Sequence, residues 1–279
     1  MFSKQRRNER SFQKNAQREL KRLCRGEWHP LLPLYAPPDV LLHPSRAEVR
    51  IVPFFLKEKA PVVLCCPGGA YAGVSWIDEG YDIARALNER GFSVLLLRYR
   101  TGPRAKNGNP PADVAAAMQW LRDNADKYRL DAENVFLCGF SAGGHLAAYY
   151  AATAKKNGWL CPKALVLGYP VISLETETHG RTRQLFLGKH EHNAAAQRLA
   201  SVEQIADAQY PPTFTMHCED DTCVPSSNSL RLKARLDEVG VPCECALYPT
   251  GGHGCGLGKD TSADGWIDHA ADFLKRYTE

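Results

Sequence analysis

Short apolar runs recur along the chain, and they are separated by segments in which apolar residues repeat at helical spacing. Near-continuous apolar strands that alternate with helices are typical of a parallel sheet covered on both faces. We therefore predict an α/β fold, with a mostly parallel central sheet flanked by helices on both faces. The predicted strands are Val49–Phe55, Pro61–Cys66, Ser93–Tyr99, Asn134–Gly139, Ala164–Tyr169, Thr213–Cys218 and Cys243–Tyr248. The predicted helices are Ile77–Arg90, Ala112–Tyr128, Ala142–Lys156, Ser226–Val239 and Ser262–Tyr277.

The alternation stops between residues 173 and 212, where the chain becomes polar and carries His179, His190 and His192. Insertions of this kind in α/β enzymes commonly lie over the active site. We expect 173–212 to be a short insertion near the site rather than a full lid domain, with these histidines as candidate substrate contacts. Residues 36–279 then form one domain, because an α/β sheet protein of 279 residues is usually a single one.

The first 35 residues form a basic N-terminal arm. Up to Trp28 it holds nine Lys and Arg residues against three Glu, so the rest of the chain is slightly acidic although the net charge is +4. We read the arm as a solvated segment, with a polyanion-binding tail as the alternative. The net charge is too small to predict a nucleic-acid partner. No apolar stretch approaches about 18 residues, so we expect no transmembrane helix and no membrane partner.

The ten cysteines do not form a disulfide or zinc pattern. Five of them lie in or beside apolar runs, where a free cysteine behaves as a small hydrophobic residue: Cys65, Cys66, Cys138, Cys218 and Cys245. Cys243-x-Cys245 lacks the spacing of zinc ligands, so we expect no metal. The arm is not followed by the apolar region of a secretory signal, and reduced thiols together with this feature predict a cytoplasmic protein.

A G-x-S-x-G motif, Gly139 to Gly143, lies between an apolar run and an alanine-rich helical pattern. A serine at such a strand-to-helix turn has an exposed hydroxyl, and the flanking glycines permit the tight turn. The pentapeptide alone is a weak signal, but a flexible Gly/Ser loop would not predict the apolar residues on both sides. We predict that Ser141 is the nucleophile of a serine hydrolase.

A serine nucleophile needs a base, and the base needs an orienting carboxylate. In a doubly wound sheet these partners follow later strands, in the order serine, acid, histidine. The strand Thr213–Cys218 runs into three consecutive carboxylates, those of Glu219, Asp220 and Asp221, and spacing does not choose among them. His253 follows the last predicted strand in a glycine-rich loop, which is the place expected for the base.

Acyl transfer also needs hydrogen-bond donors for the developing oxyanion. The backbone N–H of Ala142, directly after the nucleophile, is one candidate. The second set is expected in the loop after an early strand, and there the chain reads Cys66-Pro67-Gly68-Gly69-Ala70-Tyr71. Glycines in this loop let the backbone approach a substrate closely.

From about Pro61 to the C-terminus the chain resembles α/β-hydrolases of the acetyl-xylan-esterase type, an esterase and lipase group. Residues 67–71 resemble the P-G-G-G-Y loop of that group, the counterpart of H-G-G-G in related lipases. The other matching segments are Glu79-Gly80, Tyr99-Arg100, Pro111-Ala112-Asp113, Gly139–His145, Pro211–Phe214, Asp221–Pro225 and Gly251–Gly254. The resemblance implies the α/β-hydrolase fold.

The resemblance also implies roles for individual residues. The family pattern D-x-x-V-P falls on Asp221, which selects it as the orienting acid beside Ser141 and His253. The implied oxyanion donors are the N–H groups of Gly69, Ala70 and Ala142, and we take Tyr71 as a candidate substrate contact. Three residues depart from the family: Ala70 replaces a glycine and should need a negative φ, while Cys218 and Cys255 change the pocket lining.

Taken together, these expectations predict that the protein is a serine carboxylic-ester hydrolase. It would need no cofactor and would act by two-step acyl transfer. The resemblance implies a small acyl group, with acetylated sugars or xylo-oligosaccharides as substrates, and a cytoplasmic chain favours imported oligosaccharides over polymeric xylan. An amide or peptide hydrolase on the same fold (formamidase or exopeptidase-like) is one alternative, although a propeller domain of the exopeptidase kind has no room here. A non-catalytic binding module is the other. The oligomeric state and the role of the arm stay open.

Overall fold

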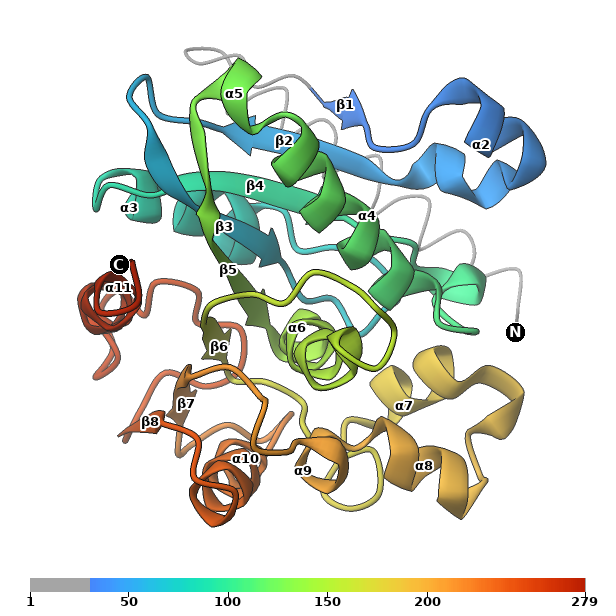
Figure 1. Ribbon diagram of the computed structural model, residues 1–279. Helices are drawn as coiled ribbons and strands as arrows, with labels where there is room; N and C mark the ends of the chain where they lie inside the picture. The colour runs from blue at the N-terminus through green and yellow to red at the C-terminus, as the bar shows by residue number, and fades with distance from the viewer. Residues whose placement is uncertain (1–30, 279) are drawn as a thin grey trace.

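The computed structural model describes residues 31–278, and its centre is an eight-stranded sheet in the order β1-β2-β4-β3-β5-β6-β7-β8 (Figure 1). Strands β1 and β2 and strands β2 and β4 pair antiparallel, and every other neighbouring pair is parallel. The strands are β1 (Leu32–Pro33), β2 (Arg50–Phe54), β3 (Ala60–Cys66), β4 (Ser93–Arg98), β5 (Leu130–Phe140), β6 (Leu165–Gly168), β7 (Thr213–Cys218) and β8 (Cys243–Tyr248). The mostly parallel sheet predicted from the sequence is confirmed.

Helices cover both faces of this sheet (Figure 1). Apolar residues of α4, α6 and α10 form one core cluster with the strands, and those of α3 and α11 form the other. The helices are α2 (Pro37–Leu42), α3 (Asp82–Asn88), α4 (Asn109–Asp123), α5 (Ala125–Tyr128), α6 (Ser141–Ala154), α7 (Gly180–Leu187), α8 (Ala194–Ala200), α9 (Val202–Ile205), α10 (Ser227–Glu238) and α11 (Trp266–Lys275). The short turns are η1 (Pro44–Glu48), η2 (Ile77–Tyr81), η3 (Gly102–Arg104) and η4 (Gly188–His190).

The central strands are buried because both of their faces carry apolar side chains. In β3 every residue except Pro61 is buried, and in β4 only Arg98 is not. Strand β8 differs, since it lies at the edge, pairs only with β7 and has no fully buried residue. The buried parallel strands hold their C-terminal ends, and the loops that follow them, in fixed positions.

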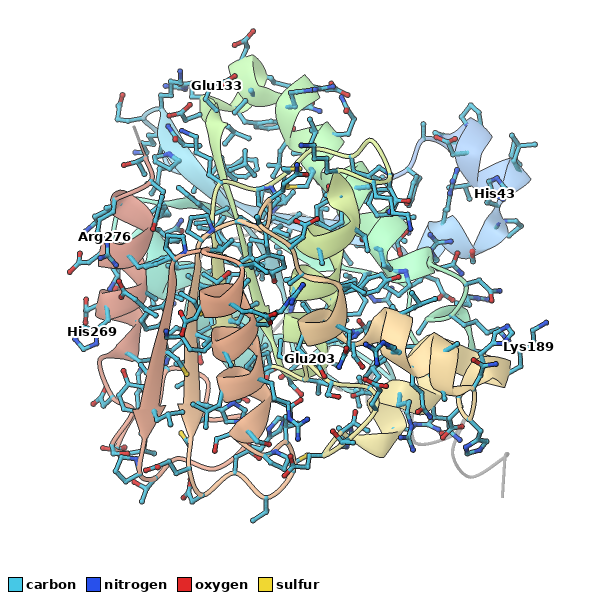
Figure 2. The ribbon with its side chains drawn as sticks, turned by 60° about the horizontal axis from the view of Figure 1, so that its bottom comes forward. His43, Glu133, Lys189, Glu203, His269 and Arg276 are labelled. Carbon is cyan, nitrogen blue, oxygen red and sulfur yellow. The ribbon has the colours of Figure 1, made fainter. Side chains whose placement is uncertain are left out.

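The stretch 173–212 is helical rather than irregular, because it contains α7, α8 and α9. It packs back on α6 through Phe186, whose ring lies 4.8 Å from the ring of His145. Figure 2 shows Lys189 at its outer end, on the opposite side of the molecule from His269 of α11 and from Arg276, which follows that helix.

Part of the predicted basic arm belongs to the sheet, since Leu32 and Pro33 pair with Ile51 and Arg50 of β2. The rest of the arm, residues 1–30, lies outside the described residues. Within residues 31–278, no helix combines the length and the apolar character that crossing a membrane requires.

Candidate active site

Ser141 lies at the turn from β5 into α6, with a left-handed φ of 52°. The flanking glycines are required by close backbone contacts. A Cβ on Gly143 would lie 2.0 Å from the carbonyl oxygen of Cys66, and one on Gly139 would lie 2.3 Å from that of Gly143. This backbone packing holds the serine in a conformation that L-residues rarely adopt, as expected for a nucleophile elbow.

The structure brings Ser141, His253 and Asp221 together in one hydrogen-bonded chain. The Ser141 Oγ lies 2.9 Å from Nε2 of His253, and the Nδ1 of the same ring lies 2.7 Å from Oδ2 of Asp221. Each residue follows the C-terminal end of a parallel strand: Ser141 follows β5, Asp221 follows β7 and His253 follows β8. When Nδ1 carries the proton that Asp221 accepts, the Nε2 lone pair is left free to accept the serine proton.

Asp221 is held as a carboxylate. Burial alone would raise its pKa, but hydrogen bonds from His217, His253 and the Val224 N–H outweigh burial and hold the pKa of Asp221 well below its usual range. Its Oδ1 accepts from the N–H groups of Cys223 and Val224, each at 2.9 Å. The acid is therefore ionised at neutral pH and fixed in orientation before any substrate binds.

His217 is a buried neighbour of this acid. Its Nε2 lies 2.8 Å from the carbonyl oxygen of Val224 and 3.2 Å from Oδ2 of Asp221. Both partners are acceptors, so Nε2 carries the proton, and Nδ1 then accepts from Ser229 at 2.9 Å. His217 thus donates a second hydrogen bond to the carboxylate that orients the base.

Among the three carboxylates after β7, geometry separates Asp221 from its neighbours. Asp220 is exposed and accepts from the N–H groups of Gly251 and Gly252, at 3.2 and 2.8 Å. It supports the backbone of the His253 loop without touching the imidazole. Glu219 is also exposed.

The loop after β3 takes an unusual backbone conformation over three successive residues. The φ angles of Gly69, Ala70 and Tyr71 are 127°, 54° and 56°. The expectation that Ala70 needs a negative φ is therefore wrong: the left-handed region costs an alanine only about 1–2 kcal/mol, which the packing around this loop offsets. No described residue accepts a hydrogen bond from the N–H of Gly69, Ala70 or Ala142, as a set of oxyanion donors requires.

The Tyr71 side chain supports the loop instead of reaching solvent. It is fully buried, its ring lies 5.9 Å from that of Tyr99, and its hydroxyl lies 2.9 Å from Nδ1 of His145. Nε2 of His145 in turn donates to the carbonyl oxygen of Ala200 at 2.9 Å, so Nδ1 accepts from the tyrosine. The side chain of Tyr71 is thus enclosed by protein, and its contact with substrate stays a prediction.

Two segments that carry the family resemblance also support this loop. The hydroxyl of Tyr99 donates to the carbonyl oxygen of Pro67 at 2.7 Å. Arg100 and Asp113 form a buried ion pair at 2.7 Å, which ties the end of β4 to α4. Tyr99 thus holds the backbone of the loop after β3, and the Arg100–Asp113 pair holds the end of β4.

The insertion contributes one histidine near the triad. Burial lowers the pKa of His179, and the charge of His253 lowers it further while Asp221 opposes the shift, so these side chains lie within electrostatic reach of one another. His190 and His192 are exposed on the insertion. The sequence did not single out Tyr169, whose ring lies 5.1 Å from that of His253; its place at the end of a predicted strand was the only signal.

The two cysteines that depart from the family pattern lie together. The Sγ atoms of Cys218 and Cys255 are 3.9 Å apart, and a Cβ on Gly251 would lie 2.5 Å from Sγ of Cys218. The Cys218 thiol therefore packs against the loop that carries His253, and Cys255 lies in that loop two residues after the histidine.

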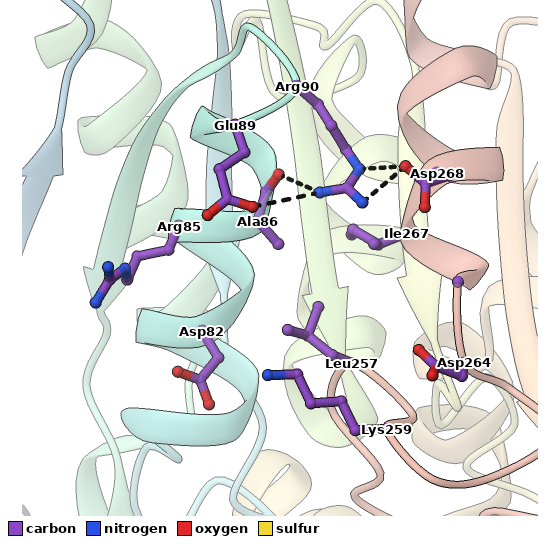
Figure 3. A pocket seen from close by; sticks show the side chains of 11 residues that line it. Asp82, Arg85, Ala86, Glu89, Arg90, Leu257, Lys259, Asp264, Ile267 and Asp268 are labelled. Atoms are coloured by element: carbon purple, nitrogen blue, oxygen red, sulfur yellow. Dashed lines mark hydrogen bonds and ion pairs between the residues drawn. The ribbon is translucent and has the colours of Figure 1, made fainter.

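A pocket of about 430 Å³ between α3 and α11 contains none of the triad residues (Figure 3). One of its charges is paired within the protein, since Arg90 donates to Asp268 at 2.7 Å and to the carbonyl oxygen of Ala86 at 2.8 Å. A second pocket, of about 570 Å³ at the C-terminal end of α6, also lacks them. Neither pocket is therefore lined by Ser141, Asp221 or His253.

Comparison with known proteins agrees with this geometry, since the BD-FAE family profile matches residues 51–236. The chain belongs to the BD-FAE family. It is 30% identical over 196 residues to an acetylxylan esterase of Xylanibacter ruminicola, and 29% identical over 220 residues to endo-1,4-beta-xylanase B of Butyrivibrio fibrisolvens. These alignments cover 69% and 75% of the chain but only 40% and 34% of the two relatives, so the chain spans less than half of either.

Among solved structures, this BD-FAE family member is similar to an acetyl ester-xyloside bifunctional hydrolase from Caldicellulosiruptor lactoaceticus. The TM-score is 0.81 at 30% identity, with 89% of this chain and 96% of that one covered. Together with the strand order and the elbow, this likeness identifies the fold as that of the α/β-hydrolases.

Proposed function

We propose that this protein is a serine carboxylic-ester hydrolase that removes small acyl groups, acetyl above all, from sugar hydroxyls. The observation that carries the proposal is the continuous chain from Ser141 through His253 to an ionised Asp221. Two similar proteins are named as an acetylxylan esterase and an acetyl ester-xyloside hydrolase, which supports acetylated xylo-oligosaccharides as the substrate class.

The proposed reaction has two steps, acylation of the serine and hydrolysis of the acyl-serine. Oγ of Ser141 attacks the ester carbonyl carbon while Nε2 of His253 takes the hydroxyl proton, and Asp221 stabilises the imidazolium. N–H groups of Gly69, Ala70 and Ala142 bind the oxyanion, each worth about 3 kcal/mol in comparable enzymes. The imidazolium then protonates the departing alcohol. A water molecule, whose proton His253 takes, then attacks the acyl-serine in the same way. This step releases the carboxylic acid and regenerates Ser141.

We also propose that the protein acts in the cytoplasm, on acetylated oligosaccharides small enough to be imported. The nine cysteines in the described part of the chain are free thiols, which suits a reducing compartment.

The first test is hydrolysis of p-nitrophenyl acetate by the wild type and by Ser141→Ala purified in parallel. We expect the alanine variant to lose at least about 10³-fold in kcat. The next substrates to test are acetylated xylobiose and xylotriose, for which the release of acetate is measured. Equal activity of both proteins would rule out Ser141 as nucleophile. Cleavage of p-nitroacetanilide in preference to the ester would instead point to an amide hydrolase, and inactivity on both substrates to a binding module.

A further inference from the structure

A second buried carboxylate, that of Glu79 in η2, lies beside the oxyanion loop and is not used in the reaction described above. Its side chain is enclosed, with 5% of the residue exposed. Its Oε2 accepts a hydrogen bond from the backbone N–H of Gly68 at 2.7 Å. Hydrogen bonds of N–H groups to a carboxylate are short and about twice as strong as neutral ones, so this contact fixes the Gly68 peptide.

Tyr169 connects the same carboxylate to the catalytic base. The Tyr169 hydroxyl accepts the N–H of Gly256 at 3.2 Å, and burial together with the nearby Glu79 carboxylate raises the pKa of this hydroxyl. Its ring lies 5.1 Å from the ring of His253, at an interplanar angle of 65°. Since the backbone N–H of Gly256 donates to the hydroxyl, the tyrosine's own proton is free to point toward Glu79. The Gly68 N–H and the Tyr169 hydroxyl therefore both face Glu79.

The pKa of Glu79 is raised above its ordinary value, because burial outweighs the effect of its partners. Burial raises the pKa of Glu79, while the hydrogen bonds from Tyr169 and Gly68 and the positive charge of a protonated His253 oppose the rise. The charge of His253 thus acts on Glu79 as well as on Asp221.

The space around Gly68 shows how the carboxylate sets the position of the loop. A Cβ at Gly68 would lie 2.7 Å from Oε2 of Glu79 and 2.9 Å from Cβ of Ser141. Gly68 is therefore held between the carboxylate and the nucleophile, and the next two residues carry the proposed oxyanion donors. A loop that loses the Glu79 contact is free to move its N–H groups away from the place where the oxyanion forms.

We propose that Glu79 is a positioning residue that holds the oxyanion loop through Gly68 and the ring of His253 through Tyr169. The inference rests on the proposed function, because the loop matters only for a reaction that develops an oxyanion. A glutamine at position 79 presents one acceptor and one donor where two donors converge. Glu79→Gln therefore leaves either Gly68 or Tyr169 without its acceptor.

The test compares Glu79→Gln with the wild type and with Glu89→Gln, which removes the same charge from a side chain that is 73% exposed. On p-nitrophenyl acetate we expect Glu79→Gln to lower kcat about tenfold, less than the loss of a whole oxyanion donor, with KM within about threefold. Amide hydrogen exchange over residues 66–75 should become faster while exchange elsewhere and the Tm match the wild type. Glu89→Gln should behave as the wild type.

Wild-type kcat and unchanged loop exchange in Glu79→Gln would overturn the inference, as would faster exchange throughout the chain, which indicates a general loss of stability. Should Glu79→Gln not fold, Tyr169→Phe tests the link to His253: we expect kcat to fall about threefold, and an unchanged kcat would refute that link. If the wild type hydrolyses no ester, the proposed function fails, while hydrogen exchange still decides whether Glu79 holds the loop.

Discussion

Asp220 and Asp221 are adjacent in the sequence but have different hydrogen-bond partners. Replacement by asparagine should therefore have different effects on activity at the two positions. In Asp221→Asn, the amide cannot accept all the hydrogen bonds that now reach Asp221 from His253, His217 and two backbone N–H groups. We expect the imidazole to turn to the wrong tautomer, and kcat on p-nitrophenyl acetate to fall about 10³–10⁴-fold with little change in KM.

Asp220→Asn is the matched control for this measurement. Its side chain accepts only from the N–H groups of Gly251 and Gly252, and an amide oxygen still serves one of them. We expect kcat to stay within about tenfold of the wild type. A loss at Asp220 as large as that at Asp221 would contradict the assignment of the acid.

His145 predicts a dependence of stability on pH. Burial lowers the pKa of this imidazole to about 4, and the hydrogen bond to Ala200 only partly opposes the shift. The unfolded chain protonates near its ordinary pKa of about 6.5, so below that pH it binds a proton that the folded protein excludes. The free energy of unfolding should therefore be highest above about pH 6.5 and fall by up to about 3 kcal/mol as the pH approaches 4.

Urea unfolding of the wild type and of His145→Gln at pH 7, 6, 5 and 4.5 measures this contribution. The variant loses two hydrogen bonds and should be less stable at pH 7. Because glutamine does not titrate, the difference between the two proteins should narrow as the pH falls. A constant difference would show that His145 is not the group responsible.

Single residues also show where prediction from the sequence fails. Local sequence patterns predict roles for Ser141 and His253, and the structure places the two side chains in contact, but no local pattern predicts the conformation of Ala70. Its positive φ is imposed by packing around a loop whose neighbours lie far away in sequence. The burial of Tyr71 has the same origin, since its partners His145 and Phe186 belong to α6 and α7.

At the scale of elements, the contact between α6 and the β3 loop depends on the absence of a side chain at Gly143. In Gly143→Ala, the new Cβ would meet the backbone oxygens of Cys66 and Pro67 at 2.0 and 2.5 Å. Backbone atoms cannot move aside as a flexible side chain does, so we expect a loss of at least about 3 kcal/mol in stability and of most activity. A protein of this size should then melt at least about 6 °C lower.

Gly180→Ala, at the first residue of α7, is the control for that substitution. No atom lies within 4 Å of a Cβ placed there. We expect an unchanged or slightly higher Tm in differential scanning calorimetry, because alanine lowers the entropy of the unfolded chain. Equal melting temperatures for both variants would contradict the steric argument.

Helices and strands could be predicted from the sequence where the apolar runs are long and are bounded by turn residues. Strands β7 and β8 match the predicted ranges residue for residue. Strand β1 was missed because two residues, Leu32 and Pro33, show no periodicity, and the helix predicted over Ile77–Arg90 begins as a π-helical turn. That turn contains Glu79, so its partners Gly68 and Tyr169 were not predictable from helical spacing.

At the scale of the whole molecule, the candidate site depends on an edge strand of the sheet. The loop of His253 follows β8, an edge strand that pairs only with β7 and is half-buried along its length. Edge elements with few buried contacts open at lower free energy than the core. In a urea titration we expect activity to be lost at a lower midpoint than the far-ultraviolet circular dichroism signal; coincident midpoints would mean that β8 unfolds with the core.

The separation of Ser141 and His253 by 112 residues has a consequence for the newly made protein. Ribosomes add about 5–20 residues per second, so about 6–22 s pass between the synthesis of the nucleophile and that of its base. During this interval the nascent chain holds a serine that nothing activates. On the proposed mechanism an unfinished chain therefore has no esterase activity, and activity begins only when the last strand has joined the sheet.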